Sequence, residues 1–584
     1  MNAPHGSRTA TQAPGRLASA TLYTLLVIVL SASGFSSVSE AEEPDWLRRE
    51  QNRIAVLDRI APTVVCVMPP NGQGGGSGVL ISGDGFAITN FHVTSGAGNF
   101  LKCGLNDGKV YDAVIVGIDP TGDVAMIQLQ GRTDFPFADV GDSDEVRVGD
   151  EVMALGNPFL LADDFSPTVT YGIVSGVHRY QYPANSFLEY TDCIQIDASI
   201  NPGNSGGPLF DINGRWIGIN GRASFEQRGR VNVGAAYAIS VRQVKLFQGH
   251  LKSGRIVDHG ITEFSVETDA NGRVQIADVI ESSEAWRRGL RAGDELVSFA
   301  QRSLTSANDF KNILGIFPSG TRIPLTVRGP DGQRTTSIRL KPLHEFQQVP
   351  PSPEPPQEPI PVQPVDPEDK PQDETPAELA SLFESRDGFT NFAFNRRNQQ
   401  RLLSRLIDKL DKIDGVDATW KMLVMEEGGT DSMTMVVGRE GAGLTQNGIP
   451  FHQTDDDPDA AAEPPDFPGL LTAALQWHRL FRGKSAGWAE IVYEGTERQF
   501  ETGTPVDVLI TRVGPVECRW LFAEDNPLPS GVDVQASAGQ DEARLLFDGW
   551  SSDGAIPHPA RLGVVIPASG EVRWLKVQSL EIRP

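Results

Sequence analysis

A run of prolines divides this chain of 584 residues into two parts. Between Pro350 and Pro376 there are eleven prolines, seven acidic residues and a single lysine. Such a composition buries little apolar surface and favours the extended polyproline conformation, so we interpret residues 350–376 as a linker. A proline-rich ligand for SH3-like domains is the alternative, which nothing else in the sequence favours. A single core spanning the whole chain is therefore excluded.

The first 41 residues have the order of parts that is typical of a secretory signal. Arg8 and Arg16 precede an apolar run from Leu22 to Leu30, and small residues follow as far as Ala41. We therefore expect a signal peptide at residues 1–41 and a protein exported across the inner membrane, most simply to the periplasm. An uncleaved membrane anchor is the alternative, although the apolar run is short for a membrane span.

Charge and cysteine content exclude several classes of function. The chain has 51 basic and 76 acidic residues, a net charge of -25, which repels phosphate backbones and makes nucleic acid a poor partner. Its four cysteines are far apart and form no CxxC pair, which argues against a zinc ribbon or a dithiol redox site. We expect isolated buried thiols, while a disulfide among the first three stays open.

Three folded regions are expected outside the signal and the linker. Residues 46–250 contain many short Val- and Ile-rich stretches separated by turn residues, for example 86–89 and 113–118, which predicts an all-β barrel or sandwich. Residues 255–343 combine strands such as 274–279 with a short helix near 307–314, which predicts a small α+β module.

The third region, residues 379–584, is predicted to be strand-rich with a leading helix. Apolar positions at helical spacing between Gln399 and Leu410 indicate that helix, and strand-like runs follow it. Turns such as the one expected at Gly495 suggest a curved antiparallel sheet similar to lipoprotein-carrier modules. The acidic stretch from Asp455 to Asp459 lacks the spacing of an EF-hand, so we interpret it as a solvated loop. Neither a metal nor a cofactor is expected in the protein.

The most informative motif surrounds Ser205, in the run Asn201-Pro-Gly-Asn-Ser-Gly-Gly-Pro-Leu. Glycines on both sides of a serine allow a tight turn that exposes the hydroxyl and aims successive backbone N–H groups at one point. In acyl transfer, that point is where the carbonyl oxygen of the substrate becomes negative. Ser205 is therefore a candidate nucleophile.

A serine needs a positioned base, usually a histidine oriented by a buried carboxylate. Of the nine histidines, only His92 lies where a predicted strand ends in a loop of polar and small residues. Asp123 follows in the run Asp119-Pro-Thr-Gly-Asp, where a polar turn leads into an apolar strand. We expect Asp123 to be buried beside the imidazole and to hold its tautomer.

These residues lie in separated blocks that resemble the HtrA/Deg family of trypsin-fold serine proteases. The blocks begin at residues 76, 89, 119, 155, 169, 195 and 236 and follow the order of that family. The resemblance implies two packed β-barrels with Ser205 as nucleophile, His92 as general base and Asp123 as the orienting residue. It also implies an oxyanion hole formed by the amides of Gly203 and Ser205.

The expected substrate contacts come from the same resemblance. Ser199, followed by Ile200, stands where trypsin-like enzymes carry an aspartate, so small or medium apolar side chains are favoured over Lys or Arg. Peptide would bind as an added strand along Ile219, Asn220 and Gly221. Two residues depart from the family pattern, Phe91 and Ser240, and neither touches the proposed chemistry.

Residues 255–343 resemble a PDZ domain, chiefly in the run from Glu281 to Val297. Such domains bind the C-terminus of a peptide through the amides of a glycine-containing loop. That loop would be His259-Gly260-Ile261, a loose fit, and the neighbouring Asp258 would disfavour a carboxylate.

The sequence as a whole predicts a mainly β protein: a chymotrypsin-like double β-barrel, an α+β PDZ domain, the linker and a strand-rich C-terminal domain. Its expected function is a serine endopeptidase that hydrolyses unfolded or damaged extracytoplasmic proteins through an acyl-enzyme on Ser205. The alternative is a chaperone or peptide-binding module with latent or narrowly restricted proteolysis. Family resemblance further implies a homo-oligomer, specifically a trimer.

Overall fold

The computed structural model describes residues 44–583 except 71–73, 158–163, 182–189, 226–231, 345–376, 412–415, 455–463, 484–487, 501, 538, 552–555 and 568. The expected signal peptide, the expected linker and the acidic loop at 455–459 lie outside the described residues. Strands predominate elsewhere, which confirms the prediction of a mainly β chain. No described helix is both long and apolar enough to cross a membrane.

The described chain begins with helix α2 (Asp45–Ile60). The acidic Asp45 lies in its first turn and the basic Arg59 in its last. The helix dipole favours a negative charge at the N-terminus and a positive charge at the C-terminus, so both residues stabilise the helix. The residues from Leu57 onward form one compact unit.

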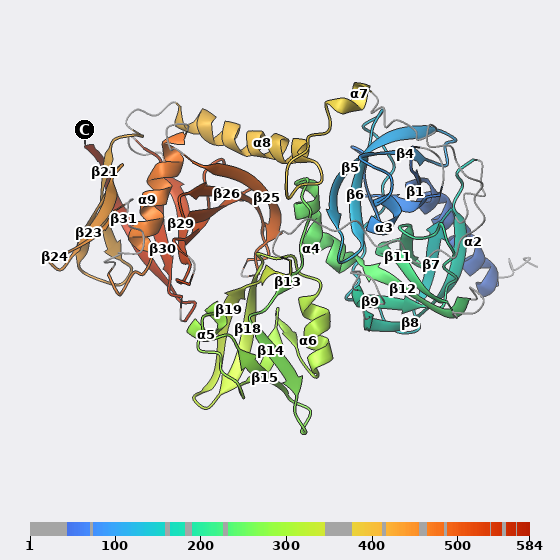
Figure 1. Ribbon diagram of the computed structural model, residues 1–584, viewed down its shortest axis with the longest axis horizontal. Helices are drawn as coiled ribbons and strands as arrows, with labels where there is room; N and C mark the ends of the chain where they lie inside the picture. The colour runs from blue at the N-terminus through green and yellow to red at the C-terminus, as the bar shows by residue number, and fades with distance from the viewer. Residues whose placement is uncertain are drawn as a thin grey trace, which may run out of the picture. The chain divides into compact units, whose positions relative to one another are not determined.

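Two closed six-stranded barrels follow and confirm the chymotrypsin-like double barrel (Figure 1). The first contains β1 (Val64–Met68), β2 (Gly76–Leu80), β3 (Phe86–Thr89), β4 (Phe100–Gly104), β5 (Val110–Asp119) and β6 (Val124–Leu129). The second contains β7 (Glu151–Gly156), β8 (Thr168–Gln181), β9 (Tyr190–Ile196), β10 (Pro208–Asp211), β11 (Trp216–Phe225) and β12 (Asn232–Ser240).

Each barrel encloses its own apolar core. Val65, Leu101 and Ile127 are buried in the first, and Val152 and Ile217 in the second. Two helices flank these strands, the short α3 (Phe91–Thr94) after β3 and α4 (Val241–Lys252) after β12. Because the cores are separate, a site at their junction can combine loops of both barrels.

The module at residues 255–343 is α+β, as predicted. Its strands are β13 (Gly260–Ile261), β14 (Phe264–Thr268), β15 (Val274–Val279), β16 (Glu295–Phe299), β17 (Arg302–Ser303), β18 (Arg322–Gly329), β19 (Gly332–Arg339) and β20 (Lys341–Pro342). Its helices are α5 (Glu284–Arg287) and α6 (Ala307–Leu314). The Ser306 hydroxyl accepts from the amide of Asp309 and caps α6, which explains why the helix begins at the predicted residue.

The C-terminal region is built on one antiparallel sheet of eleven strands among the described residues. In sheet order these are β24 (Ile449–Thr454), β23 (Gly441–Gln446), β22 (Ser432–Val437), β21 (Thr419–Glu426), β31 (Val572–Arg583), β30 (His558–Val565), β29 (Ala543–Ser551), β28 (Gly531–Gln535), β27 (Val516–Ala523), β26 (Pro505–Val513) and β25 (Glu490–Arg498). The short α7 (Ala377–Ala380) and the leading helix α8 (Phe392–Leu410) precede the sheet, and α8 begins seven residues before the predicted start at Gln399.

A second long helix, α9 (Leu470–Phe481), was not predicted, and all twelve of its residues are buried. It packs against β23 and also against β28 and β29 (Figure 1). β23 and β29 are five positions apart in the sheet, about 24 Å if the sheet were flat, whereas a helix is only about 10 Å across. The sheet must therefore curve around α9, which agrees with the curved sheet expected from the sequence.

The prediction of a turn at Gly495 was wrong. Gly495 lies inside β25, where the pairing with β26 shifts register between Tyr493 and Gly495. A Cβ at Gly495 would lie 2.8 Å from the carbonyl carbon of Gly249 at the end of α4. The glycine therefore marks a bulge and a close backbone approach, which are the usual reasons for glycine within a strand.

All four cysteines are buried and free, as the sequence indicated. Burial raises the pKa of the Cys66 thiol to about 11 and that of Cys518 to about 12. Both thiols therefore stay protonated and unreactive at neutral pH.

Candidate active site

Asp123 is held by its own backbone as well as by its side chain. It immediately precedes β6, is fully buried, and has a φ of 58°, in the left-handed region that is costly for residues other than glycine. Its carbonyl accepts from the Asn90 side-chain amide at 2.9 Å and from the Phe91 amide at 3.2 Å. These bonds from the segment after β3 fix the turn that presents the carboxylate.

His92 lies directly against that carboxylate. The sequence placed it in a loop, but it belongs to the one-turn helix α3, which begins after Asn90. Its Nδ1 is 2.8 Å from Oδ2 of Asp123, and its backbone N–H donates to Oδ1 at 3.0 Å. Burial favours the neutral imidazole, but the charge and hydrogen bond of Asp123 outweigh this and raise the pKa of His92 above its usual 6.5. The side chain keeps 41% of its surface exposed, so Nε2 can meet a substrate.

The Ser205 turn is bonded to the first barrel. Ser77 of β2 donates its backbone N–H to the carbonyl of Ser205 at 2.8 Å, and its hydroxyl donates to the carbonyl of Gly203 at 2.6 Å. Gly206 and Gly207 must both be glycine, because an added Cβ would lie 2.2 Å from a backbone oxygen in each case. The turn is thus held at the junction of the two barrels.

Two backbone amides in this turn are free to stabilise an anion. Gly203 has a φ of 103°, and neither its N–H nor that of Ser205 has an acceptor among the described residues. Unpaired neighbouring amides are what an oxyanion hole requires. This is the placement that the sequence resemblance implied for these two groups.

Ser205 and His92 come from adjoining segments but do not share a hydrogen bond within the described part of the chain. A Cβ at Gly206 would lie 3.0 Å from the amide of Asn90, two residues before His92. The Ser205 hydroxyl instead donates to the carbonyl of Gly221 at 3.3 Å. Such loose contacts between nucleophile and base are common without substrate and tighten in the complex.

The residues expected to contact substrate divide into two groups. Ile200 and Ile219 are buried, and the carbonyl of Ser199 accepts from the Thr170 hydroxyl at 3.0 Å. Ile219 pairs with both β10 and β12, and Asn220 exchanges backbone hydrogen bonds with Gly206 and Gly207, so neither offers a free strand edge.

On the β10 side of β11, the backbone has no strand partner at Gly221 among the described residues, and the Gly221 carbonyl accepts only the Ser205 hydroxyl. The expectation of strand addition along Ile219 and Asn220 therefore needs correction. The available edge starts one residue later than predicted, because the Ser205 turn occupies the earlier positions.

The loop expected to bind a carboxylate is engaged elsewhere. His259 is buried with Nε2 2.9 Å from Oδ1 of Asp119, which belongs to β5. The Gly260 amide donates to the carbonyl of Phe317, and Gly260 and Ile261 form β13, paired with β20. In this arrangement the Gly260 amide is not available to a peptide C-terminus.

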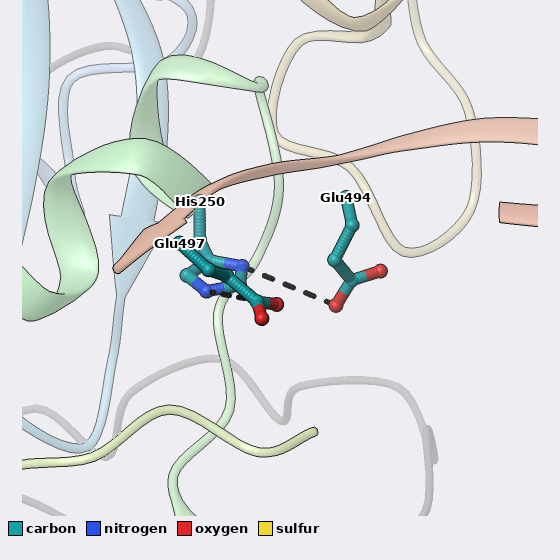
Figure 2. Close-up of side chains that lie close together, drawn as sticks. All are labelled: His250, Glu494 and Glu497. Atoms are coloured by element: carbon teal, nitrogen blue, oxygen red, sulfur yellow. Dashed lines mark ion pairs between the residues drawn. The ribbon is translucent and has the colours of Figure 1, made fainter. Parts of the chain in front are cut away.

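One cluster of potential metal ligands occurs among the described residues, formed by His250, Glu494 and Glu497 (Figure 2). Each imidazole nitrogen is 3.9 Å from a carboxylate. Arg255 pairs with Glu494 at 2.9 Å and Arg519 pairs with Glu497 at 2.6 Å. Two guanidinium groups thus balance the two carboxylates, so the cluster fits a set of arginine–glutamate ion pairs beside His250 better than a cation site.

Comparisons with known proteins identify a peptidase domain in the same part of the chain. The family model described as a trypsin-like peptidase domain matches residues 76–219. The periplasmic serine endoprotease DegP of Escherichia coli K12 is 36% identical over 285 residues, which cover 47% of this chain and 58% of DegP. The matched part of the chain is thus similar to the DegP proteases and contains a trypsin-like peptidase domain. DegP of Salmonella typhimurium is 35% identical over the same length.

The chain spans little more than half the length of these curated relatives. Among solved structures, an HtrA-type protease, AlgW with tripeptide, is 29% identical, covers 50% of this chain and 96% of its own, and has a TM-score of 0.41.

Three residues in the candidate site were not predicted from the sequence. Ser77 anchors the oxyanion turn, Asn90 holds the Asp123 carbonyl, and Tyr190 donates its hydroxyl to Oδ2 of Asp123. Ser77 and Asn90 lie inside blocks that the sequence analysis singled out, so their position was a usable signal. Tyr190 lies 67 residues from Asp123, and nothing in its own segment indicates the contact.

Proposed function

We propose that the protein is a serine endopeptidase that hydrolyses peptide bonds in unfolded or damaged extracytoplasmic proteins. The observation that carries this proposal is the pair of the partly exposed His92 and the buried Asp123, beside a serine turn with two free amides. General base, orienting carboxylate and oxyanion donors are the parts that acyl transfer to a serine needs. Homology to periplasmic endoproteases supports peptide as the substrate and the periplasm as the compartment.

The reaction follows from the roles of these groups. Oγ of Ser205 attacks the scissile carbonyl carbon while its proton passes to Nε2 of His92, and the amides of Gly203 and Ser205 stabilise the oxyanion. His92 then protonates the leaving amine as the C–N bond breaks. Water deprotonated by His92 hydrolyses the acyl-enzyme and restores Ser205. Asp123 holds Nδ1 of His92 throughout and stabilises the imidazolium that forms.

Substrate selection rests on the residues around the turn. Ser199 brings no negative charge to the expected side-chain pocket, which favours small or medium apolar side chains at the cleaved position. The substrate backbone would pair with the strand edge that starts at Gly221. Residues 255–343 would act as a PDZ-type module, and the protein would assemble into a homo-oligomer, a trimer by family resemblance.

A permanently unfolded substrate tests the proposal most directly. The purified mature protein is incubated with a reduced and alkylated protein, in parallel with Ser205→Ala and the control Ser265→Ala, an exposed serine of β14. We expect cutting by the wild type and the control, none by folded Ser205→Ala, and cleavage after small apolar residues in mass spectra. A fluorophosphonate probe should label the wild type on Ser205.

The resting contact between Ser205 and Gly221 favours a second outcome, a protease that is latent until substrate binds. In that case the wild type would react with the probe slowly and would cut only selected proteins. Equal cutting by wild type and Ser205→Ala would show that Ser205 is not the nucleophile. If the wild type neither cut the substrate nor reacted with the probe, the proposed hydrolase function would be excluded.

A further inference from the structure

Tyr190 crosses from one barrel to the other at the candidate active site. It is the first residue of β9 in the second barrel, and only 2% of its surface is exposed. Its hydroxyl donates to Oδ2 of Asp123, which immediately precedes β6 of the first barrel. The contact joins the two halves of the fold at the carboxylate itself.

The hydroxyl completes the hydrogen bonding of a fully buried charge. Oδ1 of Asp123 accepts the backbone N–H of His92 at 3.0 Å, and Oδ2 lies 2.8 Å from Nδ1 of the same residue. In the described part of the chain, Tyr190 is the only side chain other than His92 that donates to this carboxylate. A buried carboxylate is costly unless it is paired and hydrogen-bonded, and a carboxylate held from two sides cannot rotate away from the imidazole.

The same ring also lies against the backbone that receives the Ser205 hydroxyl. A Cβ on Gly221 would lie 2.8 Å from Cε1 of Tyr190 and 3.0 Å from its hydroxyl oxygen. Gly221 is therefore glycine because the tyrosine ring occupies the space of a side chain. Its carbonyl accepts from Oγ of Ser205 at 3.3 Å. One side chain thus touches both the orienting carboxylate and the strand that holds the nucleophile at rest.

We propose that Tyr190 is a positioning residue of the active site, which fixes the Asp123 carboxylate opposite Nδ1 of His92 through its hydroxyl. This inference rests on the proposed hydrolase function. Tyr190 does not touch the substrate and acts through Asp123 and His92. The ring alone fills the space beside Gly221, so the hydroxyl is the group that carries the positioning role.

Tyr190→Phe separates the hydroxyl from the ring. The matched control is Tyr111→Phe, which removes an equivalent hydroxyl that donates to Asp107 at 2.7 Å on the surface. Each variant is assayed on a peptide substrate taken from the mapped cleavage sites, with kcat and KM measured across pH and thermal unfolding recorded. Fluorophosphonate labelling rates provide a readout that does not depend on peptide binding.

We expect kcat of Tyr190→Phe to fall about tenfold or more, the usual effect of losing a hydrogen bond to a charged group, with KM changed less than twofold. Loss of the O–H leaves the negative charge of Asp123 less dispersed, which strengthens its attraction for the imidazolium. The acid limb of the pH profile should therefore move to higher pH. Tyr111→Phe should match the wild type in kcat, in KM and in the position of the acid limb.

Asp123→Asn provides a second test. If Tyr190 acts through the carboxylate, adding Tyr190→Phe to Asp123→Asn should lower the labelling rate by less than twofold, since coupled residues are not additive. Full additivity, or a Tyr190→Phe variant with unchanged kcat and pH profile, would overturn the inference while the proposed function stood. Loss of thermal stability without a change in kcat would assign Tyr190 a purely structural role. A wild type that neither cleaves nor labels would overturn both.

Discussion

The hydroxyl of Ser77 donates a 2.6 Å hydrogen bond to the carbonyl of Gly203. This bond ties to the first barrel the peptide that lies between the two unpaired amides of Gly203 and Ser205. The same hydroxyl oxygen accepts from the amide of Asn157 at 2.9 Å. A single buried serine therefore links β2, the segment after β7 and the oxyanion turn.

Ser77→Ala should lower kcat about a hundredfold, because the peptide between Gly203 and Asn204 loses the bond that sets its orientation and the oxyanion donors on either side of it lose their alignment. Stability should fall by about 1–3 kcal/mol, since the Asn157 amide keeps no acceptor. Peptide hydrolysis and thermal unfolding measure the two effects. A variant that loses stability but keeps kcat would show that the turn holds its shape without Ser77.

Gly206→Ala should abolish activity and reduce stability. The backbone at Gly206 has a φ of 84°, and a Cβ there would lie 2.2 Å from the carbonyl oxygen of Ser77 and 2.3 Å from Oγ1 of Thr89. Gly108→Ala is a matched control, because its φ is 75° and an added Cβ meets no atom within 4 Å. That control should lose only about 1–2 kcal/mol of backbone conformational energy and keep its activity. Equal losses in both variants would contradict the proposed clash.

The pH profile of hydrolysis should report the pair of His92 and Asp123. Only neutral His92 accepts the serine proton, so kcat/KM should fall as pH drops through its pKa, and that pKa is raised above 6.5. The half-maximal rate should therefore lie above pH 6.5. Asp123→Asn removes the charge that raises the pKa, so the acid limb should shift to lower pH and the maximal rate should fall on the order of 10⁴-fold. An unshifted limb in Asp123→Asn would assign the titration to another group.

His250 should make the folded protein sensitive to acid. Burial lowers its pKa below 6.5 and outweighs the charges of Glu497 and Glu494. Between the pKa of His250 in the folded chain and its higher pKa in the unfolded chain, the unfolded chain binds the proton more readily. The free energy of unfolding should therefore fall as pH drops below about 6.5, by at most about 1.4 kcal/mol per pH unit.

Thermal unfolding of the wild type and His250→Gln at pH 7.5 and about pH 5.5 tests this expectation. The difference between the two pH values should be smaller in His250→Gln than in the wild type. His452→Gln, an exposed histidine of β24, is the control and should follow the wild type. A wild type and a His250→Gln variant with the same pH dependence would show that the imidazole binds its proton equally well in the folded and the unfolded chain.

Local sequence was sufficient where local chemistry decides the outcome. The strand at 86–89 and the helix at 307–314 were predicted with their observed bounds. Turn residues adjoin the strand and an N-cap serine begins the helix, so the signals for both elements lie in the neighbouring sequence. His92, Asp123 and Ser205 were identified because the chemistry of each needs particular neighbours in the chain. Helix α9 was missed because it is short and largely apolar, as a buried strand would be, and its polar residues Thr472, Gln476 and Arg479 are buried with the rest of it.

Tertiary structure alone decided which distant groups meet. Tyr190 reaches Asp123 across the barrel junction, Ser77 bonds to Gly203 over 126 positions, and Gly495 serves a close approach to α4 rather than a turn. None of these partners lies within the same element, so no periodicity or spacing could indicate them. The sequence by itself determined the double barrel and the residues able to do the chemistry. Their orientation depends on hydrogen bonds between barrels, which exist only once both cores have formed.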